Sequence, residues 1–310
     1  MFDNPFTSPG QWYRANLHAH TTNSDGDLSP EDCAEFYRRA GYDILALTDH
    51  WCVSEVTGAR PLWGGVAHPN GVAEPQAVPL LVPGVELDGG RSAQGTSYHI
   101  VGLNLHTRGR MARREGATAQ QLVDMIRDDV GDAFLAHPYW SGLMASDMMR
   151  LEGCFAVEVY NTGCDLEILR GYSAVQWDDL LTLGHNFGAV AVDDGHHHAM
   201  DHGLAWTMIR AEELSVEAVM EALRRGRYYA STGPEIRDLK VAGGRIHITT
   251  SPVVSIALVS APTLGGRVFA PEGERLTEAE FPLPEARYCR VEIADGNGKT
   301  AWSNPVLLAS

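Results

Sequence analysis

The segment Tyr13-Arg14-Ala15-Asn16-Leu17-His18-Ala19-His20 is the part of the chain from which the fold is most directly inferred. Residues 13–17 have the pattern of a β-strand, and two histidines spaced two apart end it. Side chains two apart on a strand point to the same face, so His18 and His20 can bind one metal ion together. Asp25 follows five residues later in a Ser-Asp-Gly loop. Taken alone, such a pair more often belongs to a surface loop.

A second apolar run, residues 44–47, ends in Thr48-Asp49-His50. The run is typical of a buried parallel strand, and active sites of α/β barrels and open sheets lie at the C-terminal ends of such strands. His50 occupies one of these ends. Two interpretations of Asp49 are open: a carboxylate that orients a ligand histidine, or a turn or helix-capping residue.

Further apolar runs carry a histidine or a carboxylate at one end. Glu86 follows residues 82–85, His99 opens residues 98–103, and His137 follows residues 134–136. Asp194 and His196 follow residues 190–192. Asp193 is an alternative ligand, although the spacing of two from His196 favours Asp194.

This repetition at strand ends favours a metal centre over a chance distribution of polar residues. Imidazole and carboxylate groups suit zinc, manganese or iron. Two or three such ions can lower the pKa of a bound water, hold a bridging hydroxide, and polarise a phosphoryl or carbonyl oxygen.

The first 235 residues or so alternate strand patterns with helix patterns, which predicts parallel strands with crossover helices in an α/β barrel or a doubly wound sheet. Strands are expected at residues 13–17, 44–47, 79–87, 98–103, 133–136, 155–160, 188–192, 205–209 and 227–230. Helices are expected from Ser29 onward and over residues 117–129, 165–183 and 215–225. The sequence Ser29-Pro30-Glu31-Asp32 is typical of a capped helix start.

The last 75 residues have a different pattern, so we divide the chain into residues 1–235 and residues 236–310. Short runs rich in β-branched residues at 240–241, 245–250, 253–259, 288–293 and 305–308 predict a small antiparallel β domain, sandwich-like in form. The stretch Asp295-Gly296-Asn297-Gly298 predicts a hairpin turn. The second part carries as many acidic as basic residues, so the net negative charge belongs to the first.

Composition limits the function classes. The chain has 310 residues, a formal net charge of −16 and 13 histidines. This charge argues against a protein that binds long duplex nucleic acid and against a polybasic membrane anchor. No run is long and apolar enough to span a membrane, and the start of the chain lacks the pattern of a secretory signal. The five scattered cysteines predict free thiols, and with these features a cytoplasmic location.

Taken together, these motifs resemble the PHP (polymerase and histidinol phosphatase) family. The resemblance covers about residues 12–235 and depends on the segments 17–26, 48–50, 84–86, 136–138 and 194–196. The segments 228–234 and 301–305 are similar to the stand-alone CehA/McbA-like branch, which carries a C-terminal β domain.

The resemblance implies a distorted (β/α)7 barrel that holds two or three divalent metal ions. It implies one ion bound by His18, His20, Glu86 and Asp194, a second by Glu86, His99 and His137, and a third by Asp25, His50 and His196. It also implies catalytic roles for Asp194, His196 and Glu86, in a phosphoesterase whose metal-bridging hydroxide attacks a phosphate ester. Two alternatives stay open: a metal-dependent hydrolase of an ester, carbamate or amide, and a non-catalytic metal-binding or interaction module.

The expected partner is a small-molecule substrate, a phosphate ester, with a nucleotide or short oligonucleotide left open. Arginine side chains pair well with phosphate, so six arginines of the first part are candidate phosphate contacts. They are Arg60, Arg91, Arg108, Arg110, Arg113 and Arg114. For the run from Arg108 to Arg114, a solvated loop and helix start is the favoured alternative. Asn161 and the histidines 197, 198 and 202 are further candidates for substrate contact, with packing or a solvated loop as the alternative.

Overall fold

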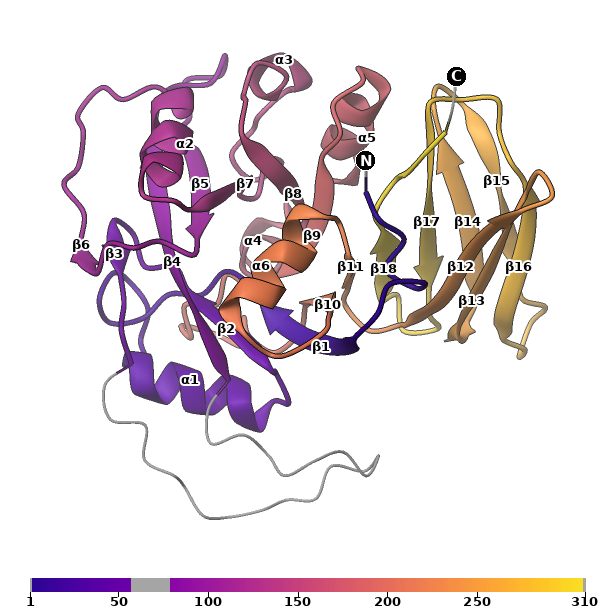
Figure 1. The fold of residues 1–310 in the computed structure, drawn as a ribbon, viewed down its shortest axis with the longest axis horizontal. Helices are drawn as coiled ribbons and strands as arrows, with labels where there is room; N and C mark the ends of the chain where they lie inside the picture. The colour runs from indigo at the N-terminus through magenta and orange to yellow at the C-terminus, as the bar shows by residue number, and fades with distance from the viewer. Residues whose placement is uncertain (1, 57–78, 309–310) are drawn as a thin grey trace.

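The computed structural model describes residues 2–56 and 79–308, and Arg60 therefore lies outside the described residues. Its centre is a large curved sheet with helices on its outer side (Figure 1). The strands that carry or precede the predicted metal ligands, with β8 between the last two of them, follow one another in the order β1-β2-β4-β5-β7-β8-β9. Their bounds are Gln11–Asn16, Ile44–Leu47, Leu80–Gly89, Tyr98–Leu103, Asp132–Leu135, Cys154–Asn161 and Gly188–Val192.

Strand direction in this sheet is mixed. β1, β2 and β4 are parallel neighbours, as are β7, β8 and β9, but β5 is antiparallel to both β4 and β7. The expectation of parallel strands throughout is therefore wrong at β5. The connection from β4 to β5 runs from Gly89 to Tyr98, which is too short for a crossover helix, so the two strands form a hairpin.

β10 (Trp206–Ala211) pairs with β1 in the antiparallel direction and leads to β11 (Tyr228–Ser231). β10 also contacts β9 through one side chain. The Thr207 hydroxyl donates to the Ala191 carbonyl at 3.1 Å and accepts from the Ala191 amide at 3.2 Å. Because this contact uses a side chain, no backbone ladder between β9 and β10 is among the described pairings. Alternate apolar residues of these strands pack together, with α6 against them.

The first helix begins at the capping signal that the sequence predicts. α1 starts at Pro30, and the Ser29 hydroxyl accepts a hydrogen bond from the Asp32 amide. Cysteine and tyrosine side chains of α1 pack against β2. The helix bounds are Pro30–Arg39 (α1), Ala119–Asp128 (α2), Ala145–Met148 (α3), Thr162–Ile168 (α4), Ala174–Thr182 (α5) and Val216–Arg224 (α6).

One helix expected over residues 165–183 is in fact two. α4 ends at Leu169, whose φ of +59° is left-handed, and the chain then turns back to the end of β8. There the Asn161 amide donates to the Gly171 carbonyl, and a Cβ at Gly171 would lie 2.4 Å from the Asn161 carbonyl oxygen. The apolar periodicity did not reveal this close approach, which only glycine permits.

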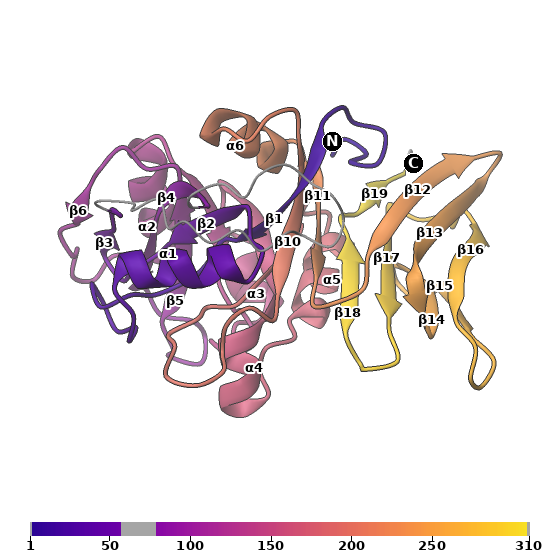
Figure 2. The same cartoon turned by 90° about the horizontal axis from the view of Figure 1, so that it is seen from below.

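The C-terminal strands form two antiparallel layers at one end of the molecule (Figure 2). One layer continues the large sheet through β11 in the order β11-β18-β17-β14-β15, and the other has the order β12-β13-β16. Apolar side chains of both layers pack in one cluster, as the sandwich-like expectation requires. The Asp295–Lys299 turn joins β17 to β18, which confirms the predicted hairpin. The expected runs did not include β15, β16 and β18.

The strands of these layers, and two short strands near the metal-ligand segments, have the following bounds. They are Cys52–Val53 (β3), Gly109–Arg110 (β6), Ile236–Ala242 (β12), Arg245–Val253 (β13), Ser255–Ser260 (β14), Leu264–Phe269 (β15), Leu276–Pro282 (β16), Tyr288–Ala294 (β17), Thr300–Ser303 (β18) and Val306–Leu307 (β19). All five cysteines are free. No helix in the described ranges is long and apolar enough to cross a membrane.

Candidate metal centre

The nine predicted ligand side chains gather at one side of the large sheet. The backbone segments that carry them are joined to one another: the His20 amide donates to the Gly195 carbonyl, and the Asp194 amide donates to the His18 carbonyl, both at 3.0 Å. His50 forms a parallel bridge to Glu86. His99 lies opposite Asp88 in the β4–β5 ladder, and Glu86 is therefore its diagonal neighbour on the same face.

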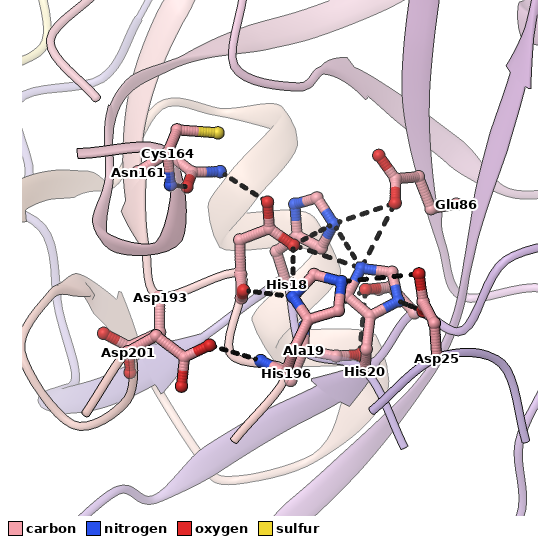
Figure 3. A network of polar contacts seen from close by, with 12 residues as sticks. His18, Ala19, His20, Asp25, Glu86, Asn161, Cys164, Asp193, His196 and Asp201 are labelled. Atoms are coloured by element: carbon pink, nitrogen blue, oxygen red, sulfur yellow. Dashed lines mark hydrogen bonds and ion pairs between the residues drawn. The ribbon is translucent and has the colours of Figure 1, made fainter. Parts of the chain in front are cut away.

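Four donor atoms converge at the centre. The Nε2 atoms of His18 and His20 lie 3.1 Å apart, and each lies 3.1 Å from Asp194 Oδ1. Glu86 Oε2 lies 3.3 Å from His18 Nε2 and 3.2 Å from His20 Nε2. All four side chains are buried, and Figure 3 shows His18, His20 and Glu86 turned toward one another.

Glu86 connects this group to a second one through its other oxygen. Its Oε1 lies 2.7 Å from His99 Nδ1 and 3.3 Å from His137 Nε2. His137 Nε2 also lies 3.9 Å from Asp194 Oδ2. His50 Nδ1 lies 3.4 Å from Glu86 Oε2, so a compact set of donors is also formed by His50, Glu86 and His99.

A third group lies where the centre opens to the surface. Asp25 Oδ2 is 3.6 Å from both His50 Nε2 and His196 Nε2, and Asp25 Oδ1 is 3.3 Å from His20 Nδ1. The four residues form one set of donors. A cleft of about 430 Å³ opens over the centre, and Asp25, His50 and His196 line it.

Hydrogen bonds orient the imidazole rings. His18 Nδ1 lies 2.6 Å from Glu158 Oε1 and His196 Nδ1 lies 2.9 Å from the Asp194 carbonyl, so in the neutral form of each ring Nδ1 carries the proton and Nε2 has the free electron pair. His137 Nδ1 contacts Ser141 Oγ at 3.1 Å.

Glu158 and Asn161 form hydrogen bonds that hold the predicted ligands in position. Glu158 Oε2 accepts from the His137 amide at 2.7 Å and from Asn161 Nδ2 at 2.8 Å. Asn161 Nδ2 also donates to Asp194 Oδ2 at 3.0 Å. Asn161 thus makes positioning contacts with two carboxylates of the centre, and sequence reasoning did not identify Glu158. A charged residue inside the apolar run 155–160 was the signal that marked it.

Asp193 and Asp194 are adjacent in the sequence but contact different groups. Asp193 accepts hydrogen bonds from the amides of Gly203, Leu204 and Ala205 at 2.6, 3.0 and 2.9 Å, so it holds the chain that follows the ligand loop. Asp194, with φ of +51°, turns its carboxylate into the group of imidazoles instead. Figure 3 shows the Asp193 side chain apart from the cluster, next to Asp201.

Asp49 does not touch a ligand histidine directly. Its carboxylate accepts from the Thr21 amide and hydroxyl, both at 2.7 Å, and from Ser24 Oγ at 2.6 Å. Ser24 Oγ lies 3.3 Å from His20 Nδ1. Asp49 therefore fixes the loop that carries Asp25 and reaches His20 through one hydroxyl.

Charges in the metal-free centre balance one another. Burial alone would lower the pKa of His18, but the charges of Asp194, Glu86 and Glu158 raise it well above its usual value. Burial would raise the pKa of Glu86, but the charges of His18, His99 and His50 hold it well below its usual value. Protons on imidazoles therefore supply the positive charge that the buried carboxylates need.

The residues fit divalent cations. Two buried polar atoms, His50 Nδ1 and Asp194 Oδ1, make no hydrogen bond, although each faces groups of the centre. Four donors with electron pairs aimed at one small volume repel each other unless a proton or a cation lies between them. A mixed set of imidazole and carboxylate donors is typical of zinc, manganese and iron sites.

Comparison with known proteins gives a local sequence likeness and a fold likeness. No family model matches the sequence. A 5'-3' exoribonuclease of Haemophilus influenzae is 33% identical over 89 residues, which are 29% of this chain and only 28% of that enzyme.

Two solved structures resemble the whole chain or its larger part. A two-domain protein from Bacteroides vulgatus, described as containing a predicted PHP-like metal-dependent phosphoesterase, superposes with a TM-score of 0.53 at 15% identity, over 100% of this chain and 98% of the other. This likeness shows a shared fold. An amidohydrolase from Chromobacterium violaceum gives a TM-score of 0.43 at 17% identity, over 69% of this chain and 96% of the other.

Proposed function

We propose that this chain is a metal-dependent hydrolase of the PHP family, and that it acts as a phosphoesterase of the CehA/McbA-like branch. In this proposal the curved sheet is a distorted (β/α)7 barrel, residues 1–235 form the catalytic part, and residues 236–310 form an accessory β domain. The shared fold with the protein from Bacteroides vulgatus supports the architecture.

The observation that carries the proposal is the position of Glu86. One of its carboxylate oxygens faces His18, His20 and His50, and the other faces His99 and His137. A buried carboxylate between two groups of imidazoles is suited to bridge two cations. The proposed ligand sets are His18, His20, Glu86 and Asp194; Glu86, His99 and His137; and Asp25, His50 and His196.

Divalent cations bound in these sets would lower the pKa of a coordinated water and polarise a phosphoryl oxygen. The protein's own contribution is orientation. Glu158 and Asn161 hold His18 and Asp194 so that their donor atoms face the same volume. We assign catalytic roles to Glu86, Asp194 and His196, because the first two are shared between donor groups and His196 borders the cleft.

Two features support a phosphate ester as the substrate. The relative from Haemophilus influenzae is by name an exoribonuclease, and such an enzyme cleaves phosphodiester bonds. Two arginines, Arg110 and Arg113, line a second cleft of about 430 Å³ that shares Asp25, His50 and His99 with the first. We therefore propose a small phosphate ester, a nucleotide or a short oligonucleotide as the substrate, and zinc, manganese or iron as the cation.

The test compares substrates and metals side by side. A chelator first removes the metal from the protein. The metal-free protein should not hydrolyse aryl phosphate mono- or diesters, whereas protein reloaded with zinc, manganese or iron should. Elemental analysis should find two or three ions per chain. Full activity of the stripped chain, or hydrolysis of aryl carboxylic esters with none of aryl phosphates, would refute the proposal.

A further inference from the structure

Two adjoining clefts over the metal centre differ in their charged lining. Toward α4 the first cleft is lined by apolar and acidic side chains, including Trp140, Leu166 and Glu167. Toward β3 and β6 the second cleft is lined by Arg110 and Arg113, with Asp25 and Asp88 beside them. Arg110 and Arg113 are the arginines among the described residues that line either cleft. A substrate that lies across the centre therefore meets guanidinium groups on one side only.

Arg110 is held in place by the segment that carries a ligand. It lies on β6, which pairs with β3 so that Arg110 is opposite Cys52, two residues after His50 (Figure 1). The Met111 amide donates to the Trp51 carbonyl at 2.8 Å and reinforces this pairing. Arg110 Nη2 donates to the Asn23 carbonyl at 3.2 Å, on the loop that carries Asp25. Its position is therefore coupled to two ligand segments.

The charge of Arg110 is not neutralised within the described part of the chain. Its Nη2 donates to a backbone carbonyl, and it takes part in none of the ion pairs among the described residues. The guanidinium group therefore keeps N–H donors for a ligand, and a planar fork of donors suits phosphate or carboxylate.

Arg113 lines the same cleft as Arg110, and two neighbouring side chains hold it in place. Arg113 Nη2 lies 3.1 Å from Asp88 Oδ1, and its guanidinium carbon lies 5.4 Å from the Trp51 ring centre. Asp88 also accepts from Trp51 Nε1 at 2.7 Å, so the aspartate shares its charge with a second donor. Because Arg113 is largely exposed, its remaining N–H groups face solvent and the cleft.

Arg108, in the same connection, is engaged differently. Its Nη1 donates to the carbonyls of Leu105, His106 and Thr107, and its Nε lies 3.6 Å from Glu55. Arg108 does not line the cleft. It therefore serves as a matched control for a charge of the same kind.

We propose that Arg110 and Arg113 form a subsite for a second anionic group of the substrate. The preferred substrates are then phosphate esters that carry a further phosphate or carboxylate a few bonds away from the scissile phosphate. This inference rests on the proposed function, because it places the scissile phosphate at the metal centre.

The test measures binding rather than turnover. Zinc-loaded chain is titrated calorimetrically with propylphosphonate, 3-phosphonopropionate and propane-1,3-diphosphonate, none of which has an ester bond to cleave. We expect the two ligands with a second anion to bind about tenfold or more tighter than propylphosphonate, since a charge-assisted hydrogen bond contributes that much. The difference in affinity between the last two ligands shows whether the subsite prefers a carboxylate or a phosphate-like group.

Two variants and one control complete the experiment. Arg110→Ala and Arg113→Ala should each reduce the affinity ratio at least fivefold, whereas Arg108→Ala should leave it unchanged. Arg110→Ala stays interpretable even where Arg113→Ala disturbs the Asp88 contact, because Arg110 is exposed and forms no ion pair with any described residue. Equal affinities for the three ligands would overturn the subsite. A preserved ratio in a chain that cleaves no phosphate ester would overturn the proposed function instead.

Discussion

Glu158 Oε1 lies 2.6 Å from Nδ1 of His18, and neither side chain is exposed to solvent. The two residues are 140 positions apart in the sequence. The contact fixes the proton of His18 on Nδ1, so the Nε2 electron pair points at Glu86 and Asp194. One buried carboxylate in the middle of a strand thus orients a residue that we propose as a metal ligand.

Glu158→Gln should weaken metal binding by about 10- to 100-fold, because a neutral amide lacks the negative charge that raises the basicity of His18. Competition with a chromophoric chelator measures this affinity. Glu152→Gln, an exposed change nearby, is the control and should leave the affinity unchanged. Equal affinities for the native chain and Glu158→Gln would show that the contact does not tune the centre.

Asp193→Ala should reduce the stability of the chain, whereas Asp194→Ala should reduce its metal content. Without Asp193 one buried and two half-buried amides lose their acceptor, so we expect a loss of about 2–5 kcal/mol in the free energy of unfolding. Without Asp194 the chain should stay folded but bind at least one metal ion fewer. Urea denaturation and elemental analysis measure the two effects. The assignment of roles fails if Asp193→Ala loses metal while retaining native stability.

The stability of the metal-free chain should fall as the pH rises above neutrality. The pKa of His18 and that of His20 are raised well above their usual value, in each case because carboxylates outweigh burial. A raised pKa contributes stability that is fully present below the unfolded pKa of about 6.5 and is lost as the pH rises through the folded pKa. Bound zinc replaces these protons, so the zinc-loaded chain should not show this loss.

Melting temperatures at pH 7, 8, 9 and 10, with zinc or with a chelator, test this linkage. The difference between loaded and stripped chain should widen with pH. Curves that stay parallel over this range would contradict the proton-for-metal exchange.

The buried thiols should react slowly in the native chain. Burial raises the pKa of Cys33 and of Cys289 to about 12, so little thiolate is present at pH 8. Labelling with an aromatic disulfide reagent should be slow in buffer and should reach five thiols per chain in denaturant. Rapid labelling of all five without denaturant would show that the thiols are more accessible than their burial implies.

Arg290→Met should destabilise the contact between the C-terminal layer and the helical part. Arg290 on β17 is 2% exposed and pairs with Asp178 of α5 through Nε at 2.7 Å and Nη2 at 2.6 Å. Removing the arginine leaves Asp178 without its ion-pair partner and with only a long hydrogen bond from the Tyr288 hydroxyl, which should cost about 3 kcal/mol. Chemical denaturation measures the loss, and Arg237→Met, an exposed change on β12, should cost little. Equal effects of the two changes would exclude a special role for the buried pair.

Local sequence patterns predicted most elements of the α/β part. β2, β5 and β9 have the expected bounds, and α1 starts at its expected cap. The failures have identifiable causes. A left-handed Leu169 and the close approach at Gly171 divide one apolar periodic stretch into α4 and α5. β15 is exposed along its whole length, so it lacks the alternating pattern by which sequence reasoning finds strands.

The sequence by itself determined which residue types stand at the strand ends, because the period of a strand and the position of His18, His20, His50, Glu86 and Asp194 in it are local properties. Only the tertiary structure decided which of them meet. Glu86 faces two groups of imidazoles, Glu158 supports His18, and Arg110 lies beside the centre while Arg108 does not. These contacts join segments far apart in the chain. They depend on the order and register of the strands, and no local propensity encodes either of these.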